Sequence, residues 1–134
     1  MLKFAANLSM LFVEHSFLDR FSAAAAAGFT AVECQFPYDH SPEDLGECLH
    51  STGLELILLN FPAGDLTTGE RGLAAFPDRL AQCREQIDYG LDFAVRLGCP
   101  RMHLLSGLIP AGLAHEVALS TYVDNIRYAV QRAG

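Results

Sequence analysis

Basic residues are scarce in this chain. Lys and Arg total 9 against 16 Asp and Glu, which gives a formal net charge of −7. Proteins that bind nucleic acid or an anionic lipid surface need a basic footprint to neutralise phosphates. The sequence shows no such footprint, so we expect neither nucleic acid nor a membrane among its partners.

Paired cysteines and targeting segments are also missing. The four cysteines (Cys34, Cys48, Cys83 and Cys99) are far apart and form no CxxC motif. This spacing is typical of buried free thiols in a reducing compartment. The amino terminus lacks the charged and apolar regions of a secretion signal, and no apolar run reaches bilayer length. These absences lead us to expect a soluble, cytoplasmic protein.

Motifs of several common active sites are absent as well. There is no GxGxxG or GxxxxGK[ST] phosphate loop and no GxSxG nucleophile elbow. Three acid–histidine pairs occur, Glu14-His15, Asp39-His40 and His115-Glu116. Their members are adjacent instead of four residues apart, so they do not share a helix face as metal ligands would. We predict no metal site at these pairs.

The chain does contain four strand-like runs, each followed by a segment with helical apolar spacing. The runs are Phe4–Ser9, Phe29–Phe36, Leu54–Asn60 and Arg101–Ser106, and the first three helical segments end at Gly28, Gly53 and Gly98. This alternation predicts one α/β domain with parallel strands and helical crossovers. Parallel sheets carry their chemistry at the carboxyl ends of the strands, so polar residues there are the candidates for function.

Local signals place the helices between these runs. Ser16 with Asp19 resembles an N-cap, and Ser41 before Pro42 starts a second helix with acidic residues in its first turn. Apolar spacing predicts further helices from about Arg79 to Leu97 and around residues 117–130. Residues 61–78 form a long loop, and loops of that length are usually functional or disordered.

Four strand–helix units do not close a (β/α)₈ barrel, which needs eight strands and roughly 250 residues. Two architectures therefore remain open from periodicity alone. The chain is either a small open α/β sheet that is complete in itself or the front half of a barrel.

Six segments carry a family pattern in order from Phe4 to about Ala129: residues 4–9, 31–38, 60–65, 69–73, 97–103 and 124–129. Together they resemble the hydroxypyruvate isomerase family of xylose-isomerase-like (β/α)₈ barrels. The related 2-oxo-tetronate isomerases share the same pattern.

This resemblance implies a fold and a reaction. Residues 1–134 would be the amino-terminal half of a TIM barrel, a half barrel of four βα units. The family interconverts hydroxypyruvate and 2-hydroxy-3-oxopropanoate (tartronate semialdehyde), an aldose–ketose isomerisation in glyoxylate metabolism. Its catalytic glutamates lie on strands of the second half, so we expect them beyond Gly134 and expect no catalytic residue here. A divalent metal, Mg²⁺ or Mn²⁺, serves the full-length family, and we expect no metal site in this chain.

Four residues near the ends of different strands are the candidate substrate-binding residues: Asn7, Glu33, Asn60 and His103. We predict that they converge at the carboxyl end of the sheet. Glu33 either lines a polar pocket or pairs with an Arg or Lys of a neighbouring unit. His103 is either a hydrogen-bonded core residue or a site residue. The two asparagines either satisfy turn backbone or contact substrate.

Three charged residues of the long loop, Asp65, Glu70 and Arg71, form a second group of candidates. They are either ordinary solvated side chains or part of a lid or rim over a site. A hypothesis from a different functional class also stays open. The chain would then be a non-catalytic half barrel that self-associates through its open sheet edges or pairs with a complementary half.

Overall fold

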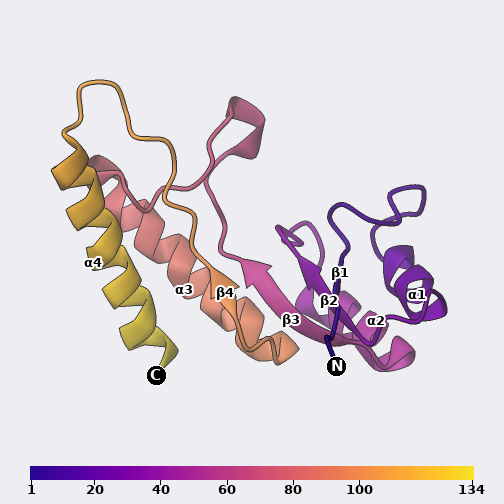
Figure 1. Ribbon diagram of the computed structural model, residues 1–134. Helices are drawn as coiled ribbons and strands as arrows, with labels where there is room; N and C mark the ends of the chain where they lie inside the picture. Colours follow the sequence, from indigo (N-terminus) through magenta and orange to yellow (C-terminus); the bar gives the residue numbers. More distant parts are fainter. The chain divides into compact units, whose positions relative to one another are not determined.

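A computed structural model describes all 134 residues. Strands and helices alternate along the whole chain (Figure 1). The elements are β1 (Ala6–Asn7), α1 (Asp19–Ala26), β2 (Ala31–Cys34), α2 (Pro42–Thr52), β3 (Glu55–Asn60), α3 (Leu80–Leu97), β4 (Met102–His103) and α4 (His115–Ala133), with short 3₁₀ turns at Leu66–Thr68 and Pro77–Arg79. None of the helices has the length and hydropathy of a membrane-spanning segment.

The four strands form one sheet in the order β1-β2-β3-β4. β1 pairs with β2 and β2 with β3, both in parallel. Towards β4, the Leu59 amide donates to the Arg101 carbonyl at 3.1 Å and the Phe61 amide to the His103 carbonyl at 2.9 Å. Sequential order confirms the arrangement predicted for part of a barrel. A doubly wound sheet would instead reverse its strand order at a switch point.

Two of the strands are much shorter than predicted. β1 and β4 contain only two residues each, because the backbone beyond them makes other hydrogen bonds. After β1, the amides of Met10 and Leu11 both donate to the Asn7 carbonyl, at 3.1 and 2.9 Å, and the chain turns. After β4, Ser106 forms an antiparallel bridge with Gly72 of the long loop.

The chain consists of two compact units, and their boundary passes through β3, α3 and β4. The first unit comprises residues 1–59 and 93–102, and the second comprises residues 60–92 and 103–134. Each unit has its own packing.

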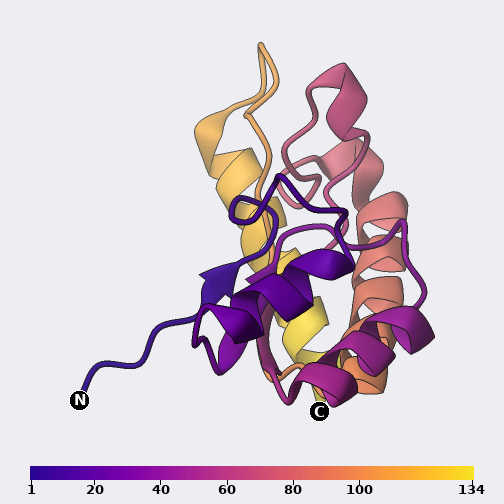
Figure 2. The same cartoon turned by 90° about the vertical axis from the view of Figure 1, so that its right-hand side faces the viewer.

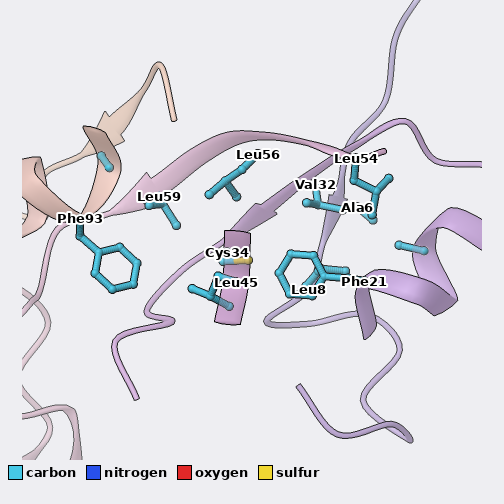
Figure 3. Close-up of a cluster of buried hydrophobic side chains, with 12 residues drawn as sticks. Ala6, Leu8, Phe21, Val32, Cys34, Leu45, Leu54, Leu56, Leu59 and Phe93 are labelled. Carbon is cyan, nitrogen blue, oxygen red and sulfur yellow. The ribbon is translucent and has the colours of Figure 1, made fainter. Parts of the chain in front are cut away.

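The first unit is built around a buried apolar cluster on one face of its strands (Figure 3). Alternate residues of β2, Val32 and Cys34, point into this cluster. Helices α1, α2 and the end of α3 contribute Phe21, Leu45 and Phe93, and α1 and α2 lie side by side (Figures 1 and 2). The helices of this unit therefore cover a single face of the sheet, as predicted for the outside of a barrel.

The ends of α2 follow the sequence signals closely. The Ser41 hydroxyl accepts a hydrogen bond from the Asp44 amide at 3.1 Å, Pro42 occupies the first helical position, and Gly53 ends the helix with φ of +69°. The prediction for α1 is wrong in one detail. Ser16 bonds to the Asp19 side chain at 2.5 Å, but α1 begins after Leu18 and has no side-chain cap.

The second unit contains the long loop, and that loop is ordered. Five of its side chains are buried: Phe61, Ala63, Leu73, Ala74 and Ala75. Asn125 of α4 is fully buried and donates its amide to the Ala74 carbonyl at 2.9 Å. Helices α3 and α4 are joined where Tyr128 and Arg132 both bond to Asp88, each at 2.8 Å.

All four cysteines are free, and the prediction of burial holds for two of them. Cys34 and Cys83 are each 3% exposed, whereas Cys48 and Cys99 are partly exposed. Burial raises the pKa of the Cys34 thiol to about 12 and the pKa of Cys83 to about 11. Thiols with such pKa values stay protonated at neutral pH and are weak nucleophiles, so they are core residues.

Candidate functional site

Asn7 and Glu33 form a hydrogen-bonded pair in the first unit. They are register partners on the neighbouring strands β1 and β2, and the Asn7 amide nitrogen donates to Glu33 Oε1 at 2.9 Å. The Asn7 amide oxygen accepts from the Ser9 backbone amide at 3.0 Å, which turns its nitrogen towards Glu33. Both side chains are half-buried and alternate with residues that face the apolar core.

This pair contradicts one of the two alternatives for Glu33, the pairing with an Arg or Lys, whereas its pocket-lining role stays a prediction. We expected either a polar pocket or a salt bridge, and the partner is a neutral amide on the adjacent strand. An amide satisfies one carboxylate oxygen without neutralising the charge. The Glu33 carboxylate can therefore still accept a hydrogen bond from a hydroxyl group of a small polar ligand.

The other two candidates, Asn60 and His103, belong to the second unit, whereas Asn7 and Glu33 belong to the first. Asn60 is the last residue of β3, and only 8% of its surface is exposed to solvent. It interacts with a neighbouring group and is therefore not unpaired. His103 is exposed, so the core alternative for this histidine is wrong. The convergence of all four residues stays a prediction.

His103 lines an open pocket of about 310 Å³ in the second unit. The other lining residues are Arg71, Leu104, Leu105, Ser106, Gly107, Leu108 and Tyr122. The Tyr122 hydroxyl donates to the Leu104 carbonyl at 3.1 Å, which holds this wall of the pocket against α4. Neither an Asp nor a Glu lines the pocket, although the chain as a whole is acidic.

The three charged loop residues turn out to have different roles. Glu70 pairs with Arg79 and accepts a hydrogen bond from the Asp65 backbone amide at 2.6 Å. The hydrogen bond from Arg79 lowers the pKa of Glu70, and hydrogen bonds from Thr67 lower the pKa of Asp65. These two carboxylates therefore close the loop on itself. Arg71 lines the pocket instead.

The sequence pattern indicated Arg71 only as one of three charged loop residues, and it did not predict Ser106 or Tyr122 as pocket residues. The available signal was the run Gly69-Glu70-Arg71-Gly72, in which two glycines flank a pair of opposite charges. That run predicts a tight turn, but it does not indicate which of the two charged side chains, Glu70 or Arg71, forms an ion pair within the loop.

The residues of this chain do not fit a divalent metal by themselves. No group of three His, Cys, Asp or Glu side chains is close enough to hold an ion. Mg²⁺ requires near-octahedral coordination by oxygen atoms and Mn²⁺ prefers similar ligands, and Glu33 supplies a single carboxylate.

Two curated relatives of this chain carry isomerase names. It is 47% identical to the 2-oxo-tetronate isomerase of Haemophilus influenzae over 127 residues, covering 95% of this chain and 49% of that protein. It is 46% identical to the hydroxypyruvate isomerase of Escherichia coli over 129 residues, covering 96% and 50%. The chain thus spans about half the length of the curated relatives it matches.

Solved structures share the fold of this chain. A crystal structure of an AP endonuclease, family 2, from Brucella melitensis superposes with a TM-score of 0.95 at 41% identity, covering 99% of this chain and 51% of that one. D-psicose 3-epimerase from Clostridium cellulolyticum shares the fold, with a TM-score of 0.72 at 16% identity over 98% of this chain and 48% of that chain. The sequence profile described as Xylose isomerase-like TIM barrel matches residues 21–134. We conclude that this chain belongs to the xylose isomerase-like TIM barrel family.

Proposed function

We propose that residues 1–134 are the amino-terminal half of an isomerase barrel that acts on a short hydroxy-oxo acid. The observation that carries this proposal is the identity of 46–47% to hydroxypyruvate and 2-oxo-tetronate isomerases over nearly the whole chain. Hydroxypyruvate, converted to 2-hydroxy-3-oxopropanoate, is our first candidate substrate. The 2-oxo-tetronate reaction is the second, because the two identities are nearly equal.

The reaction moves a proton between adjacent carbons through an enediolate. It requires a base to take the proton and an electrophile to stabilise the developing oxyanion. In this chain, the Glu33 carboxylate would accept a hydrogen bond from a substrate hydroxyl group, with Asn7 holding it in place. His103 would donate a hydrogen bond to a substrate oxygen, and Asn60 would be a further substrate-binding residue.

The proton-transferring carboxylates would come from the half of the barrel that the relatives have and this chain does not cover. A bound Mg²⁺ or Mn²⁺ would polarise the oxo group of the substrate. Its ligands would have to come mainly from outside residues 1–134, since these residues do not form a metal site alone. The free thiols support a place in the reducing cytoplasm.

A fusion protein tests this proposal. The 134-residue chain is joined to the second half of the E. coli hydroxypyruvate isomerase, and turnover of hydroxypyruvate and 2-oxo-tetronate is measured with Mg²⁺, with Mn²⁺ and with a chelator. We expect metal-dependent turnover by the fusion and none by the 134-residue chain. The second half expressed alone is the control. Absence of turnover from a soluble, folded fusion on both substrates would contradict the proposal.

A further inference from the structure

We propose that Arg71 binds the carboxylate of the substrate in the pocket it shares with His103. This inference rests on the function proposed above and adds to it the residue that recognises the acid group. Both candidate substrates are carboxylates, so the site needs a group that selects an anion within a chain of net charge −7.

The first observation concerns the charge balance around Arg71. Several other arginines of the second unit have a carboxylate partner: Arg79 pairs with Glu70, Arg127 with Asp124, and Arg132 with Asp88. Arg71 has no carboxylate within ion-pair distance, although it follows Glu70 directly in the sequence. Because Arg79 takes the Glu70 carboxylate, the charge of Arg71 is left uncompensated.

The second observation is that backbone contacts orient the Arg71 side chain. One of its terminal nitrogens, Nη1, donates to the Glu70 carbonyl at 2.7 Å and to the Leu66 carbonyl at 3.4 Å. A guanidinium carries five N–H donors in a planar fork. The donors not used by these two carbonyls are sufficient for the two parallel hydrogen bonds that a carboxylate accepts from arginine.

The third observation is a glycine contact that brings Arg71 to the pocket wall. Gly72 has φ of +115°, and a Cβ atom there would be 2.2 Å from the Leu105 carbonyl oxygen. A Cβ on Gly107 would be 2.3 Å from the Gly72 carbonyl oxygen. Only glycine at both positions allows the Gly72–Ser106 bridge, which places Arg71 beside the segment that follows His103.

The pocket lining fits one anionic group with a polar neighbour. The pocket is lined by two basic side chains, Arg71 and His103, and by the hydroxyl group of Ser106. No carboxylate lines it that would repel an anion. In a hydroxy-oxo acid such as hydroxypyruvate, the oxo oxygen is on the carbon next to the carboxylate. With the carboxylate bound by Arg71, the oxo oxygen would lie one carbon away, in a pocket that His103 also lines.

NMR titration of the 134-residue chain tests this inference. Hydroxypyruvate is compared with dihydroxyacetone, in which a neutral hydroxymethyl group replaces the carboxylate, and with glycolate, which lacks the oxo group. Signals of the Arg71 side chain and the His103 ring report binding. The variants are Arg71→Gln and Arg71→Lys, with Arg127→Gln as the control, because Arg127 is exposed and pairs only with Asp124 on α4.

We expect hydroxypyruvate to shift both signals and the Arg71→Gln substitution to weaken its binding about tenfold or more, with dihydroxyacetone unaffected. Arg71→Lys should retain part of the affinity because it keeps the charge without the fork. Arg127→Gln should bind as the wild type does. Amide spectra remote from the pocket establish that each variant is folded.

The other outcomes separate the role of Arg71 from the proposed function. Equal hydroxypyruvate binding in wild type and Arg71→Gln would overturn the role of Arg71 and leave the proposed function standing. Arg71-dependent binding of glycolate as tight as that of hydroxypyruvate would support the carboxylate site but contradict the proposed substrate. No shift with any carboxylate would overturn the inference, and turnover by the fusion would still decide the proposed function.

Discussion

The Glu33 carboxylate shows how a single residue can be polar, half-buried and still available. Its partner Asn7 is a neutral amide whose orientation is fixed by the Ser9 backbone. These contacts position one oxygen of the Glu33 carboxylate and leave the carboxylate without a cationic partner. A salt bridge would also have satisfied the carboxylate, but it would have prevented a ligand from binding there.

Removing the amide gives the first prediction. Asn7→Ala should lower the free energy of unfolding by about 1.5–3 kcal/mol, the usual contribution of a hydrogen bond to a charged group. Urea denaturation followed by circular dichroism measures this loss. In a Glu33→Gln background the same substitution should cost less, because the charged acceptor is gone. A cost below about 0.3 kcal/mol in the wild-type background would mean that the pair contributes nothing.

Sequence reasoning found these residues but not their contacts. The end of a strand can be predicted from apolar runs and turn residues, so Asn7 and Glu33 could be named as candidates. Which side chain lies opposite Glu33 depends on strand register, and register is set by packing across the whole sheet. Likewise, nothing in the run from Gly69 to Gly72 shows that Glu70 pairs with Arg79 and leaves Arg71 without a carboxylate partner.

Among the elements, α2 has the clearest local signals. Ser41 accepts a hydrogen bond from the Asp44 amide at 3.1 Å and also donates to the Asp44 carboxylate at 2.7 Å. Ser41→Ala should therefore destabilise the first unit by about 1 kcal/mol. Ser51→Ala near the other end of α2 is the matched control and should change stability by less than about 0.5 kcal/mol. Equal effects of the two substitutions, measured by urea denaturation, would show that the cap contributes nothing specific.

The long loop is the element that sequence analysis described least well. Its glycines and prolines indicated an irregular path, but they gave no sign that five of its side chains are buried. Its order comes from contacts that are distant in the sequence, such as Asn125 with the Ala74 carbonyl and Ser106 with Gly72. Local patterns cannot show such contacts, and the same limitation hid the short lengths of β1 and β4.

The Glu70–Arg79 pair leads to a prediction about pH. Because Arg79 lowers the pKa of Glu70 in the folded state, the pair stabilises the fold above the ordinary Glu70 pKa of 4.5. That contribution is lost as pH falls through the lowered pKa. Glu70→Gln should therefore reduce stability at neutral pH, and its difference from the wild type should shrink below about pH 4.

Thermal unfolding between neutral and acidic pH checks this expectation. Glu85→Gln is the control, because Glu85 is an exposed residue of α3. A Glu70→Gln difference that grows on acidification would contradict the sign of the argument. A difference that stays constant with pH would show that the substitution acts through packing and not through charge.

At the scale of the molecule, the strand order leaves two strands at the edges of the sheet. β1 and β4 are these edges, and several large apolar side chains are exposed: Met10, Leu11, Val13, Leu108 and Ile109. Unpaired edges and apolar patches favour association, and the net charge of −7 opposes it.

We therefore expect the 134-residue chain to associate with itself. Sedimentation velocity over a range of protein concentrations should show species larger than a monomer that dissociate on dilution. High salt should increase association by screening the like charges. A monomer at all concentrations that also unfolds in one cooperative step would contradict this expectation.

The fold class was predictable because βα repetition extends along the whole chain. Each strand run and each helix stop repeats the same local pattern, and strand order follows from short connections between neighbours. Periodicity alone could not separate an open sheet from half a barrel. The resemblance of six segments to a barrel family favoured the half barrel, and the relatives agree, because this chain covers about half of them.

Under the proposed function, these 134 residues supply one half of an isomerase and need the other half for turnover. A titration of the purified chain with the separately expressed second half of the E. coli hydroxypyruvate isomerase tests this, with hydroxypyruvate turnover measured in the presence of Mg²⁺ or Mn²⁺. We predict no turnover by either half alone and activity that rises to a plateau at equal amounts of the two. Metal-dependent turnover by the 134-residue chain alone would contradict the claim.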